Sequence, residues 1–407
     1  MNDDIDVLII GAGAAGIAAA RELRTAGKRV RVLEARARVG GRAQTDPSLG
    51  APADLGAAWL HFADINPLVP IAQANGFSVL AREPDWGARS RVGNRQPDPA
   101  EVAGWRAAME RYDALVDAAA WRGQDVPLSR VLPEDAYRVR YDAVMTWAVG
   151  AESREISTVD LARYAESEHN WAVREGLGAV VASAAADLDV VLDAPVRRID
   201  WSRAGDVRVE TRAGATFRAR VVIVTVPTSV LATGAIEFTP PLPASHASAI
   251  EDLPLGVVNK VFFRVPESAM PREPLFTVGS ETTTRTAHYQ FWPSEQPLVL
   301  GFFGGDLSRE LENAGGLVAF AREELTRAFG ADFARQLGAS IATAWGGDEF
   351  ARGSYSVARP GKADQRGVLA EPVEPQLVFA GEACSREHFG TLVGAWESGV
   401  AAARIVR

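Results

Sequence analysis

Cysteine is almost absent from this sequence, since Cys384 is the only one among 407 residues. A single cysteine excludes a framework of internal disulfide bonds and fits a reducing compartment. No pair of histidine or cysteine residues has the spacing of metal ligands, so we expect no metal site. The Gly-x-Ser-x-Gly motif, which carries the nucleophile of many serine hydrolases, is missing as well.

Long apolar runs are also missing. No stretch of eighteen or more uncharged apolar residues occurs, and the N-terminus carries three aspartates instead of a cationic, apolar leader. The sequence ends at Arg407, directly after the last helical pattern. We therefore expect a cytoplasmic protein without a membrane anchor. The net charge of -9 disfavours nucleic acid as a partner and weakly favours a cationic small molecule.

What the sequence does contain, near its N-terminus, is a dinucleotide-binding pattern. The apolar residues 7–10 predict a strand, and the run Gly-Ala-Gly-Ala-Ala-Gly follows at 11–16 before a helix-favouring stretch. In such a pattern Gly11 permits the tight turn, Gly13 lets the backbone approach a pyrophosphate, and Gly16 lets the helix pack close to the strand. The phosphates would then lie at the positive end of the helix. A glycine-rich turn that binds no ligand is the alternative interpretation.

The residues that follow extend this pattern. A second predicted strand, 29–33, delivers Glu34 to the position where an acid accepts hydrogen bonds from a ribose, and an acid there argues against a 2′-phosphate. Residues 35–42 contain three arginines and two adjacent glycines, a flexible cationic segment beside the same phosphates. A nicotinamide dehydrogenase has no evident need for such a segment. Residues 32–42 resemble the second half of the FAD signature of the flavin-containing amine oxidase family.

The predicted domains are interleaved. Residues 98–121, 137–151 and 158–168 predict helices, and short β-rich runs follow from 190 onwards. A mostly helical block is thus inserted into a dinucleotide-binding domain that resumes near Gly176. The predicted fold class is α/β (α+β overall), with a Rossmann-like FAD-binding domain interleaved with a mixed sheet and helical substrate-binding domain. We assign to the FAD-binding domain residues 1–75, 176–240 and 346–407, and to the substrate-binding domain, with its helical insertion, residues 76–175 and 241–345.

Residues 190–265 make the resemblance more specific. Their motifs, which include the strand Val258-Asn-Lys260-Val-Phe-Phe, look most like those of polyamine oxidases and their histone-demethylase relatives. This likeness implies that Val196 offers its backbone to the adenine and that Lys260 faces flavin N5 through a water. Judged by itself, a lysine in an apolar strand could be a snorkelling or edge-strand residue. A buried ammonium needs partners, which the flavin and an ordered water would supply.

Two further segments are similar to parts of the family. Residues 54–61 resemble the segment that threads beside the isoalloxazine ring, and they put His61 where polyamine oxidases often meet the substrate amine. A structural histidine is the alternative there. Residues 345–356 resemble the segment that brings an aromatic residue, here Tyr355, to the flavin face. Ser354 stands where monoamine oxidases carry the cysteine bonded to the flavin, so the resemblance implies noncovalent FAD.

The closing motif of the family, which holds the ribityl chain and the pyrophosphate, is similar to residues 379–402. Thr391 stands by count where monoamine oxidases have a second aromatic residue, and this difference favours a diamine or polyamine substrate. Such a substrate carries a distal ammonium, for which Glu166 and Glu168 are candidate partners. The predicted catalytic residues are Lys260 and Tyr355. The predicted substrate-binding residues are His61, Glu166, Glu168, Tyr355 and Thr391. The predicted FAD-binding residues are Gly11, Gly13, Ala14, Ala15, Gly16, Glu34, Ala35, Arg36, Gly41, Arg42, Gly56, Ala57, Ala58, Trp59, Val196, Trp345, Gly381, Glu382, Thr391, Leu392, Val393 and Ala395.

The resemblance implies an FAD-dependent amine oxidase. It would move a hydride equivalent from a primary or secondary amine to flavin N5, and O2 would reoxidise the flavin and give H2O2. The expected partners are a small-molecule amine and O2, and the expected assembly is a monomer or homodimer. One alternative is another oxidase or desaturase of the same fold, of the porphyrinogen, carotenoid or amino-acid type. A second alternative is a flavoprotein that serves as a non-catalytic binding module.

Overall fold

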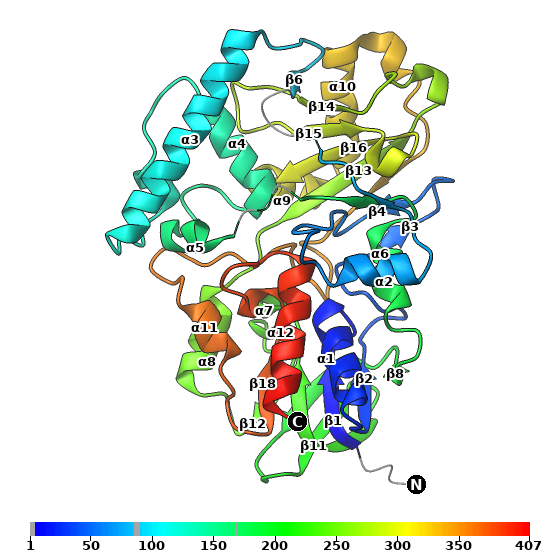
Figure 1. Ribbon diagram of the computed structural model, residues 1–407, viewed down its shortest axis with the longest axis vertical. Coiled ribbons are helices and arrows are strands. Elements are labelled where there is room, and N and C mark those ends of the chain that lie inside the picture. Colours follow the sequence, from blue (N-terminus) through cyan, green and yellow to red (C-terminus); the bar gives the residue numbers. More distant parts are fainter. Residues whose placement is uncertain (1–4, 85–89, 166, 168) are drawn as a thin grey trace.

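The computed structural model describes residues 5–84, 90–165, 167 and 169–407. Two lobes, each built around a β-sheet, are stacked along the long axis of the molecule (Figure 1). The chain passes from the first lobe to the second and back twice, so each lobe combines segments that are distant in the sequence. Glu166 and Glu168, the candidate partners of a distal ammonium, lie outside the described residues.

The sheet of the first lobe is built on the apolar strand β1 (Ile5–Ile10). It pairs in parallel with β2 (Val30–Leu33) on one side and with β11 (Thr216–Val224) on the other. Strand order is β12-β9-β10-β11-β1-β2-β8, and β18 pairs with β11. Parallel strands covered on both faces are continuously apolar, as residues 7–10 of β1 are. The other strands of this sheet are β8 (Val190–Val191), β9 (Val196–Asp200), β10 (Val207–Thr211), β12 (Glu237–Thr239) and β18 (Leu377–Phe379).

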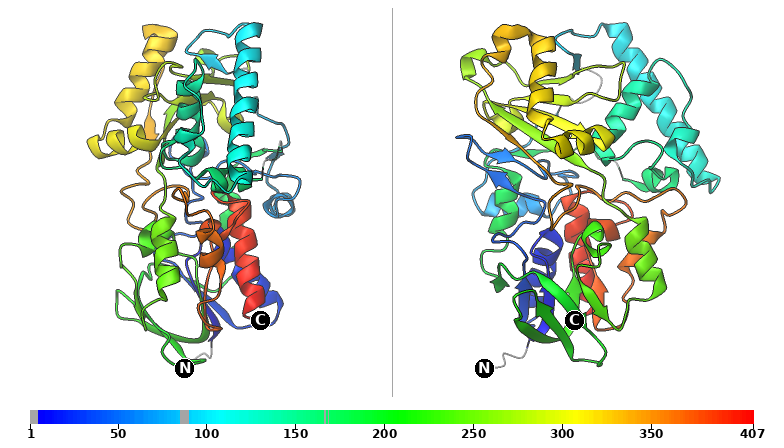
Figure 2. Two further views of the ribbon diagram at one scale, coloured as in Figure 1. Left: turned by 90° about the vertical axis from the view of Figure 1, so that its left-hand side faces the viewer. Right: turned by 180° about the vertical axis from the view of Figure 1, so that it is seen from behind.

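Two long helices cover this sheet side by side, α1 (Ala14–Thr25) and α12 (Leu392–Ile405) (Figures 1 and 2). Their backbones touch because glycines stand at the contact. A Cβ atom at Gly399 would lie 2.1 Å from the carbonyl oxygen of Ala15, closer than any side chain can approach. Helix α12, late in the sequence, is therefore fixed against the glycine-rich motif at its beginning.

The sheet of the second lobe has the order β17-β13-β16-β15-β14-β6. Its central strand β13 (Val258–Arg264) alternates between two faces. Val261 and Phe263 pack in the core beneath helices α9 (Gly305–Ala314) and α10 (Leu317–Ala334). Lys260 lies on the opposite face. The other strands are β6 (Arg91–Val92), β14 (Leu275–Val278), β15 (His288–Phe291), β16 (Leu298–Gly304) and β17 (Ser340–Ala342).

Three helices form the flank of the second lobe (Figure 1). Helix α3 (Pro99–Trp121) begins with a capping box. The Asp98 side chain accepts hydrogen bonds from two backbone N–H groups, and the Glu101 side chain accepts one from the Asp98 N–H. Helix α4 (Arg138–Val149) follows. Helix α5 (Thr158–Arg163) ends five residues before the predicted end at 168, because Tyr164 takes an extended conformation with ψ of 120°.

Shorter elements connect these parts. Helix α8 (Ala244–Asp252), whose residues the sequence analysis assigns to the substrate-binding domain, packs its Ala249 and Ile250 into the core of the first lobe. In the part of the chain that the structure describes, no helix is long and apolar enough to cross a bilayer. The predicted α/β fold class is confirmed. The remaining elements are β3 (Thr45–Asp46), β4 (Ala53–Asp54), α2 (Leu68–Ala74), β5 (Val79–Leu80), β7 (Ala172–Val173), α6 (Leu177–Ser183), α7 (Thr228–Leu231), α11 (Gln365–Ala370), and single turns at Leu128–Arg130, Glu267–Ala269, Pro293–Glu295 and Glu382–Cys384.

Candidate active site

A cavity of about 1400 Å³, including the part that opens to solvent, runs between the two lobes. Its walls are contributed by the glycine-rich turn, the end of β2, strand β13 and the start of α12. Both predicted catalytic residues line it. The predicted FAD-binding residues that line it are Gly11, Gly13, Ala14, Ala15, Glu34, Ala35, Arg36, Gly41, Arg42, Gly56, Ala57, Val196, Trp345, Gly381, Glu382, Thr391, Leu392 and Ala395.

Four predicted FAD-binding residues are not among the lining residues of this cavity. A Cβ at Gly16 would lie 1.9 Å from the carbonyl oxygen of Gly11, so Gly16 serves the packing of α1 on the turn. Val393 is fully buried in α12. Ala58 and Trp59 line a separate, smaller cavity of about 300 Å³ beside Phe262. The segment that contains them thus turns its residues 56 and 57 to the large cavity and the next two away from it.

The glycines of the large cavity leave room for a ligand along the main chain. A Cβ at Gly13 would have one protein atom at 4.0 Å and none closer, and a Cβ at Gly381 would have none within 4 Å. Gly11 and Gly381 have φ angles of 108° and 145°, which side-chain-bearing residues rarely adopt. Gly13 is the N-cap of α1, so the free N–H groups of that helix begin at this wall. These residues fit an extended dinucleotide whose phosphates lie at the helix N-terminus.

Glu34 follows the end of β2 and binds the backbone of the glycine-rich turn. Its carboxylate is buried and accepts hydrogen bonds from the N–H groups of Ala12 at 2.7 Å and Arg36 at 2.9 Å. Sequence reasoning predicted only a bond to a ribose. The structure adds that Glu34 holds the two backbone segments that flank the cavity, while its side chain still forms part of the wall.

Replacing Glu34 by alanine is therefore expected to weaken FAD binding by about 10- to 100-fold, since hydrogen bonds to charged groups contribute roughly 1.5–3 kcal/mol. Titration of the apoprotein with FAD, followed by quenching of FAD fluorescence, measures this loss. Glu237→Ala, a change at a largely exposed residue on β12, is the control and should bind FAD as the unmodified chain does. Equal affinities of the two variants would contradict the role of Glu34.

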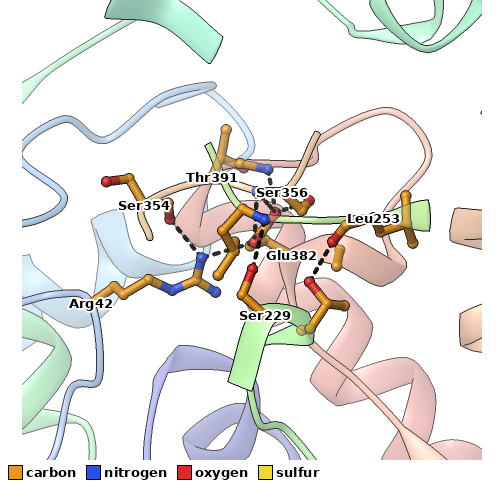
Figure 3. A network of polar contacts seen from close by, with 12 residues as sticks. Arg42, Ser229, Leu253, Ser354, Ser356, Glu382 and Thr391 are labelled. Atoms are coloured by element: carbon orange, nitrogen blue, oxygen red, sulfur yellow. Dashed lines mark hydrogen bonds and ion pairs between the residues drawn. The ribbon is translucent and has the colours of Figure 1, made fainter. Parts of the chain in front are cut away.

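A polar network surrounds Glu382 at the flavin end expected for the cavity (Figure 3). The Glu382 carboxylate accepts hydrogen bonds from the Arg42 guanidinium at 2.9 Å, the Ser356 hydroxyl at 2.6 Å and the Gly390 N–H at 2.8 Å. Arg42 also donates to the carbonyl oxygen of Ser354 at 2.6 Å. Burial alone would raise the pKa of Glu382, but Arg42, a second arginine and these hydrogen bonds lower it. The carboxylate is therefore ionised and fixes Arg42.

The second arginine, Arg366 on α11, was missed by sequence reasoning. Its side chain is fully buried and donates to the Ser356 hydroxyl at 2.7 Å. It also binds the carboxylate of Asp160 on α5 through two hydrogen bonds of 2.7 and 2.8 Å. The Phe389 ring lies 3.9 Å from the guanidinium carbon. Since Asp160 belongs to the second lobe and Arg366 to the first, this pair joins the lobes beneath the cavity.

Lys260 projects from β13 into the cavity wall and is 3% exposed. Its ammonium donates to the carbonyl oxygens of Asp54 at 2.7 Å and Gly56 at 2.6 Å. From the sequence, the flavin and a water were expected as partners of the Lys260 ammonium. In the structure, two main-chain carbonyl oxygens accept its hydrogen bonds. Burial lowers the pKa of Lys260 to about 8, although the nearby Asp54 carboxylate opposes this shift. Lys260 can thus gain or lose a proton close to neutral pH.

Tyr355 lines the cavity beside Gly390, whose hypothetical Cβ would lie 3.5 Å from that of Tyr355. Burial raises the pKa of the Tyr355 phenol, so the ring stays neutral. The neighbouring Ser354 hydroxyl donates to the carbonyl oxygen of Val258 at 2.8 Å and accepts from its N–H. Ser354 therefore anchors its segment to β13, which places Tyr355 and Lys260 on the same cavity.

Thr391 and His61, two further predicted substrate-binding residues, have structural partners. The Thr391 hydroxyl caps α12 by accepting from the Gly394 N–H at 3.0 Å and donates to the carbonyl oxygen of His388. Thr391 still lines the cavity. His61 is not among the lining residues; its Nδ1 lies 2.6 Å from the side-chain oxygen of Asn170. Burial lowers the pKa of His61, so the ring is neutral.

Among the lining residues that were not predicted as site residues are Arg212, Phe302 and Phe350. Arg212 and Phe350 close one end of the cavity, where Arg36 and Arg212 stand over the Phe350 ring at 5.4 and 5.7 Å. Phe302 on β16 lines the opposite end beside Lys260. Phe350 lies within residues 345–356, which resemble a family segment, whereas Arg212 and Phe302 lie outside the motifs used for the prediction. Among the described residues no group of three or more acidic, histidine or cysteine side chains is arranged to hold a metal ion.

Comparison with known proteins agrees with this geometry. A model of the family described as "Flavin containing amine oxidoreductase" matches residues 14–121 and 133–407. The chain is 31% identical to polyamine oxidase 4 of Oryza sativa subsp. japonica over 98% of this chain and 87% of that protein. It is 28% identical to the human lysine-specific histone demethylase 2, of which it covers 52%.

A solved structure shares the fold as well. Cyclohexylamine oxidase from Brevibacterium oxydans IH-35A superimposes with a TM-score of 0.80 and 22% identity, over 99% of this chain and 98% of that one. The family match supports amine oxidation, the first of the three functions predicted from the sequence. The cavity residues fit FAD, the cofactor of that family. The chain therefore belongs to the flavin-containing amine oxidoreductases and is an FAD-dependent amine oxidase.

Proposed function

We propose that this amine oxidase acts on a diamine or polyamine-like substrate, with the reacting nitrogen uncharged and O2 as the electron acceptor. The observation that carries the proposal is the joint position of Lys260 and Tyr355 on one cavity with the dinucleotide cradle. Bound FAD supplies the hydride-accepting chemistry and passes the electrons on to O2, which leaves as H2O2. The resulting imine is hydrolysed by water.

The side chain of Lys260 is positioned to exchange a proton with a water or amine in the cavity. A lysine ammonium has three N–H donors. Two of them bind the carbonyl oxygens of Asp54 and Gly56, which leaves one donor for a water or an amine in the cavity. Burial lowers the pKa of Lys260 to about 8. Above this pH the neutral amine can accept a proton, and below it the ammonium can donate one. Tyr355 supplies a neutral aromatic wall.

The reacting amine should be neutral because its lone pair drives the departure of the hydride. An amine with a pKa near that of lysine costs about 4 kcal/mol to deprotonate at a pH of about 7.4. A carboxylate next to the reacting nitrogen would raise this cost. Among the described lining residues, the carboxylates Glu34 and Glu382 are engaged with backbone or arginine partners. Neither Lys260 nor Tyr355 adds a negative charge at neutral pH.

The diamine or polyamine class rests on two further points. Polyamine oxidases of Oryza sativa subsp. japonica and Arabidopsis thaliana are similar to the chain over almost its whole length. Thr391, a small residue whose hydroxyl caps a helix, stands where a second aromatic wall would favour small aromatic amines. A peroxide-coupled assay of the purified holoprotein against polyamines, aliphatic monoamines, aromatic monoamines and amino acids tests the proposal. Turnover of amino acids or aromatic monoamines alone would contradict it.

The rate of flavin reduction at saturating amine is expected to rise with pH between about 6 and 10, because the fraction of neutral reacting amine rises as its proton is lost. Deprotonation of Lys260 near pH 8 acts in the same direction. Anaerobic stopped-flow measurement of flavin bleaching gives this profile. A flat profile over the same range would count against oxidation of the neutral amine.

A further inference from the structure

A row of opposed residues leads away from the reacting centre across the sheet of the second lobe. Phe302 on β16 lies directly opposite Lys260, and His288 on β15 lies directly opposite Phe302. Val278 on β14 follows. Directly opposed residues project from the same face of a sheet, so these side chains share the face of Lys260. Because adjacent strands are about 4.8 Å apart, His288 lies about 10 Å from Lys260 along the row.

Aromatic rings surround His288. Phe276 stacks on its ring at 5.7 Å with an interplanar angle of 21°, and Trp147 of α4 approaches at 5.6 Å. The Trp147 indole is fixed by a hydrogen bond to the carbonyl oxygen of Thr286. Phe302 lines the cavity and packs against the cluster that contains Trp147, so this aromatic group adjoins the cavity at Phe302. Methylene groups of a substrate would find contact surface along it.

His288 is the exception among the five histidines of the chain. The rings of His61, His169, His246 and His388 each lie within hydrogen-bonding distance of a side chain or carbonyl. In the part of the chain with described coordinates, neither ring nitrogen of His288 has such a partner. Burial lowers the pKa of His288 to about 4, so the ring is neutral and offers one lone pair and one N–H. His288 retains some exposed surface, and its ring nitrogens are not among the fully enclosed unpartnered polar atoms of the described residues.

Building on the proposed oxidation of a diamine or polyamine, we propose that His288 binds the distal amino group of the substrate. The distal ammonium donates a hydrogen bond to the imidazole lone pair, and the faces of Trp147 and Phe302 add cation–π attraction. An extended chain advances about 3.3–3.6 Å for every three bonds, so about nine bonds between the two nitrogens match the spacing of about 10 Å between β13 and β15. 1,8-Diaminooctane has this length, and octylamine is its matched monoamine.

The test compares the binding of these two amines to the holoenzyme by calorimetry, with the flavin reduced beforehand by dithionite so that no turnover occurs. The unmodified enzyme is expected to bind 1,8-diaminooctane at least about 10-fold more tightly than octylamine, the effect of one hydrogen bond to a charged group. His288→Leu should lose this preference while octylamine binding stays unchanged. His288→Asn, which keeps an acceptor, should retain part of it. His246→Asn, a change at a buried histidine of the first lobe, should leave the preference intact.

Each further outcome decides between the two proposals. Equal loss of both ligands in His288→Leu, or no loss, overturns the role of His288. The preference for 1,8-diaminooctane could instead be lost in Glu166→Gln or Glu168→Gln and kept in His288→Leu. That result would assign the distal amino group to a carboxylate and would also overturn the role of His288. If the binding preference depends on His288 but the enzyme oxidises no amine in air, the proposed function alone is overturned. Oxidation of both amines without any preference in binding overturns the role of His288 alone.

Discussion

Replacing Arg366 by methionine is expected to lower the free energy of unfolding by about 3–5 kcal/mol. The reason is that the Asp160 side chain, 3% exposed, would be left buried without its arginine partner. Arg366 itself is fully buried, and both of its bonds to Asp160 have good length, at 2.7 and 2.8 Å. Removing one member of such a pair leaves the desolvation cost of the other uncompensated.

A double variant separates this cost from the worth of the pair itself. Asp160→Leu combined with Arg366→Met removes both charges, so most of the lost stability should return. Urea unfolding of the single and double variants, compared with the parent chain, measures the difference. Arg285→Met is the matched control, because Arg285 and Glu310 also form two hydrogen bonds, of 2.8 and 2.9 Å, but on the surface. Its effect should stay within about 1 kcal/mol. Similar losses for the Arg366 and Arg285 variants would show that the buried pair does not carry the stability assigned to it.

Replacing Lys260 by methionine is expected to slow amine-dependent flavin reduction or reoxidation by about 100-fold, the lower range for loss of a positioned acid–base group. FAD should remain bound, because the cradle of glycines, Glu34 and Glu382 is untouched. Single-turnover reduction under nitrogen and reoxidation by O2, each followed by flavin absorbance, identify the slowed step. Lys362→Met, at a partly exposed lysine paired with Asp252, is the control and should retain parental rates.

The same variant has a second readout in stability. The pKa of Lys260 is lowered to about 8 in the folded chain, below the unfolded value of about 10.4. Between these values the unfolded chain binds more protons, so the contribution of Lys260 to folding stability increases as pH rises from about 8 to 10. This increase should disappear in Lys260→Met and persist in Lys362→Met, which melting curves at several pH values can measure. Unaltered kinetics together with an unaltered stability profile would refute both the role and the protonation of Lys260.

The local parts of the site could be predicted from the sequence. Gly11, Gly13 and Glu34 form one continuous strand–turn–helix–strand unit, so their spacing alone places them together. Lys260 stood out as the charged residue of an apolar strand, and that strand is β13. What could not be predicted is what each polar group binds. The partners of Lys260 are carbonyl oxygens of residues more than 200 positions earlier in the chain.

Long-range pairing explains the misses. Arg366 and Asp160 are 206 residues apart, so no local pattern pairs them. His288 and Phe302 share a face with Lys260 only through strand register, which the sequence does not specify for separated strands. Ala58 and Trp59, predicted together with Gly56 and Ala57 as FAD-binding residues, line the smaller cavity instead of the large one.

The ion pair between Arg42 and Glu382 spans 340 residues of sequence. Ribosomes add about 5–20 residues each second, so Arg42 is made roughly 20–70 s before its partner exists. During that time the glycine-rich turn can fold locally, but α12 and the segment around Glu382 are not there to close the cavity. Capture of FAD between these segments is therefore expected only after Glu382 and α12 have been synthesised, because both contribute walls of the cavity.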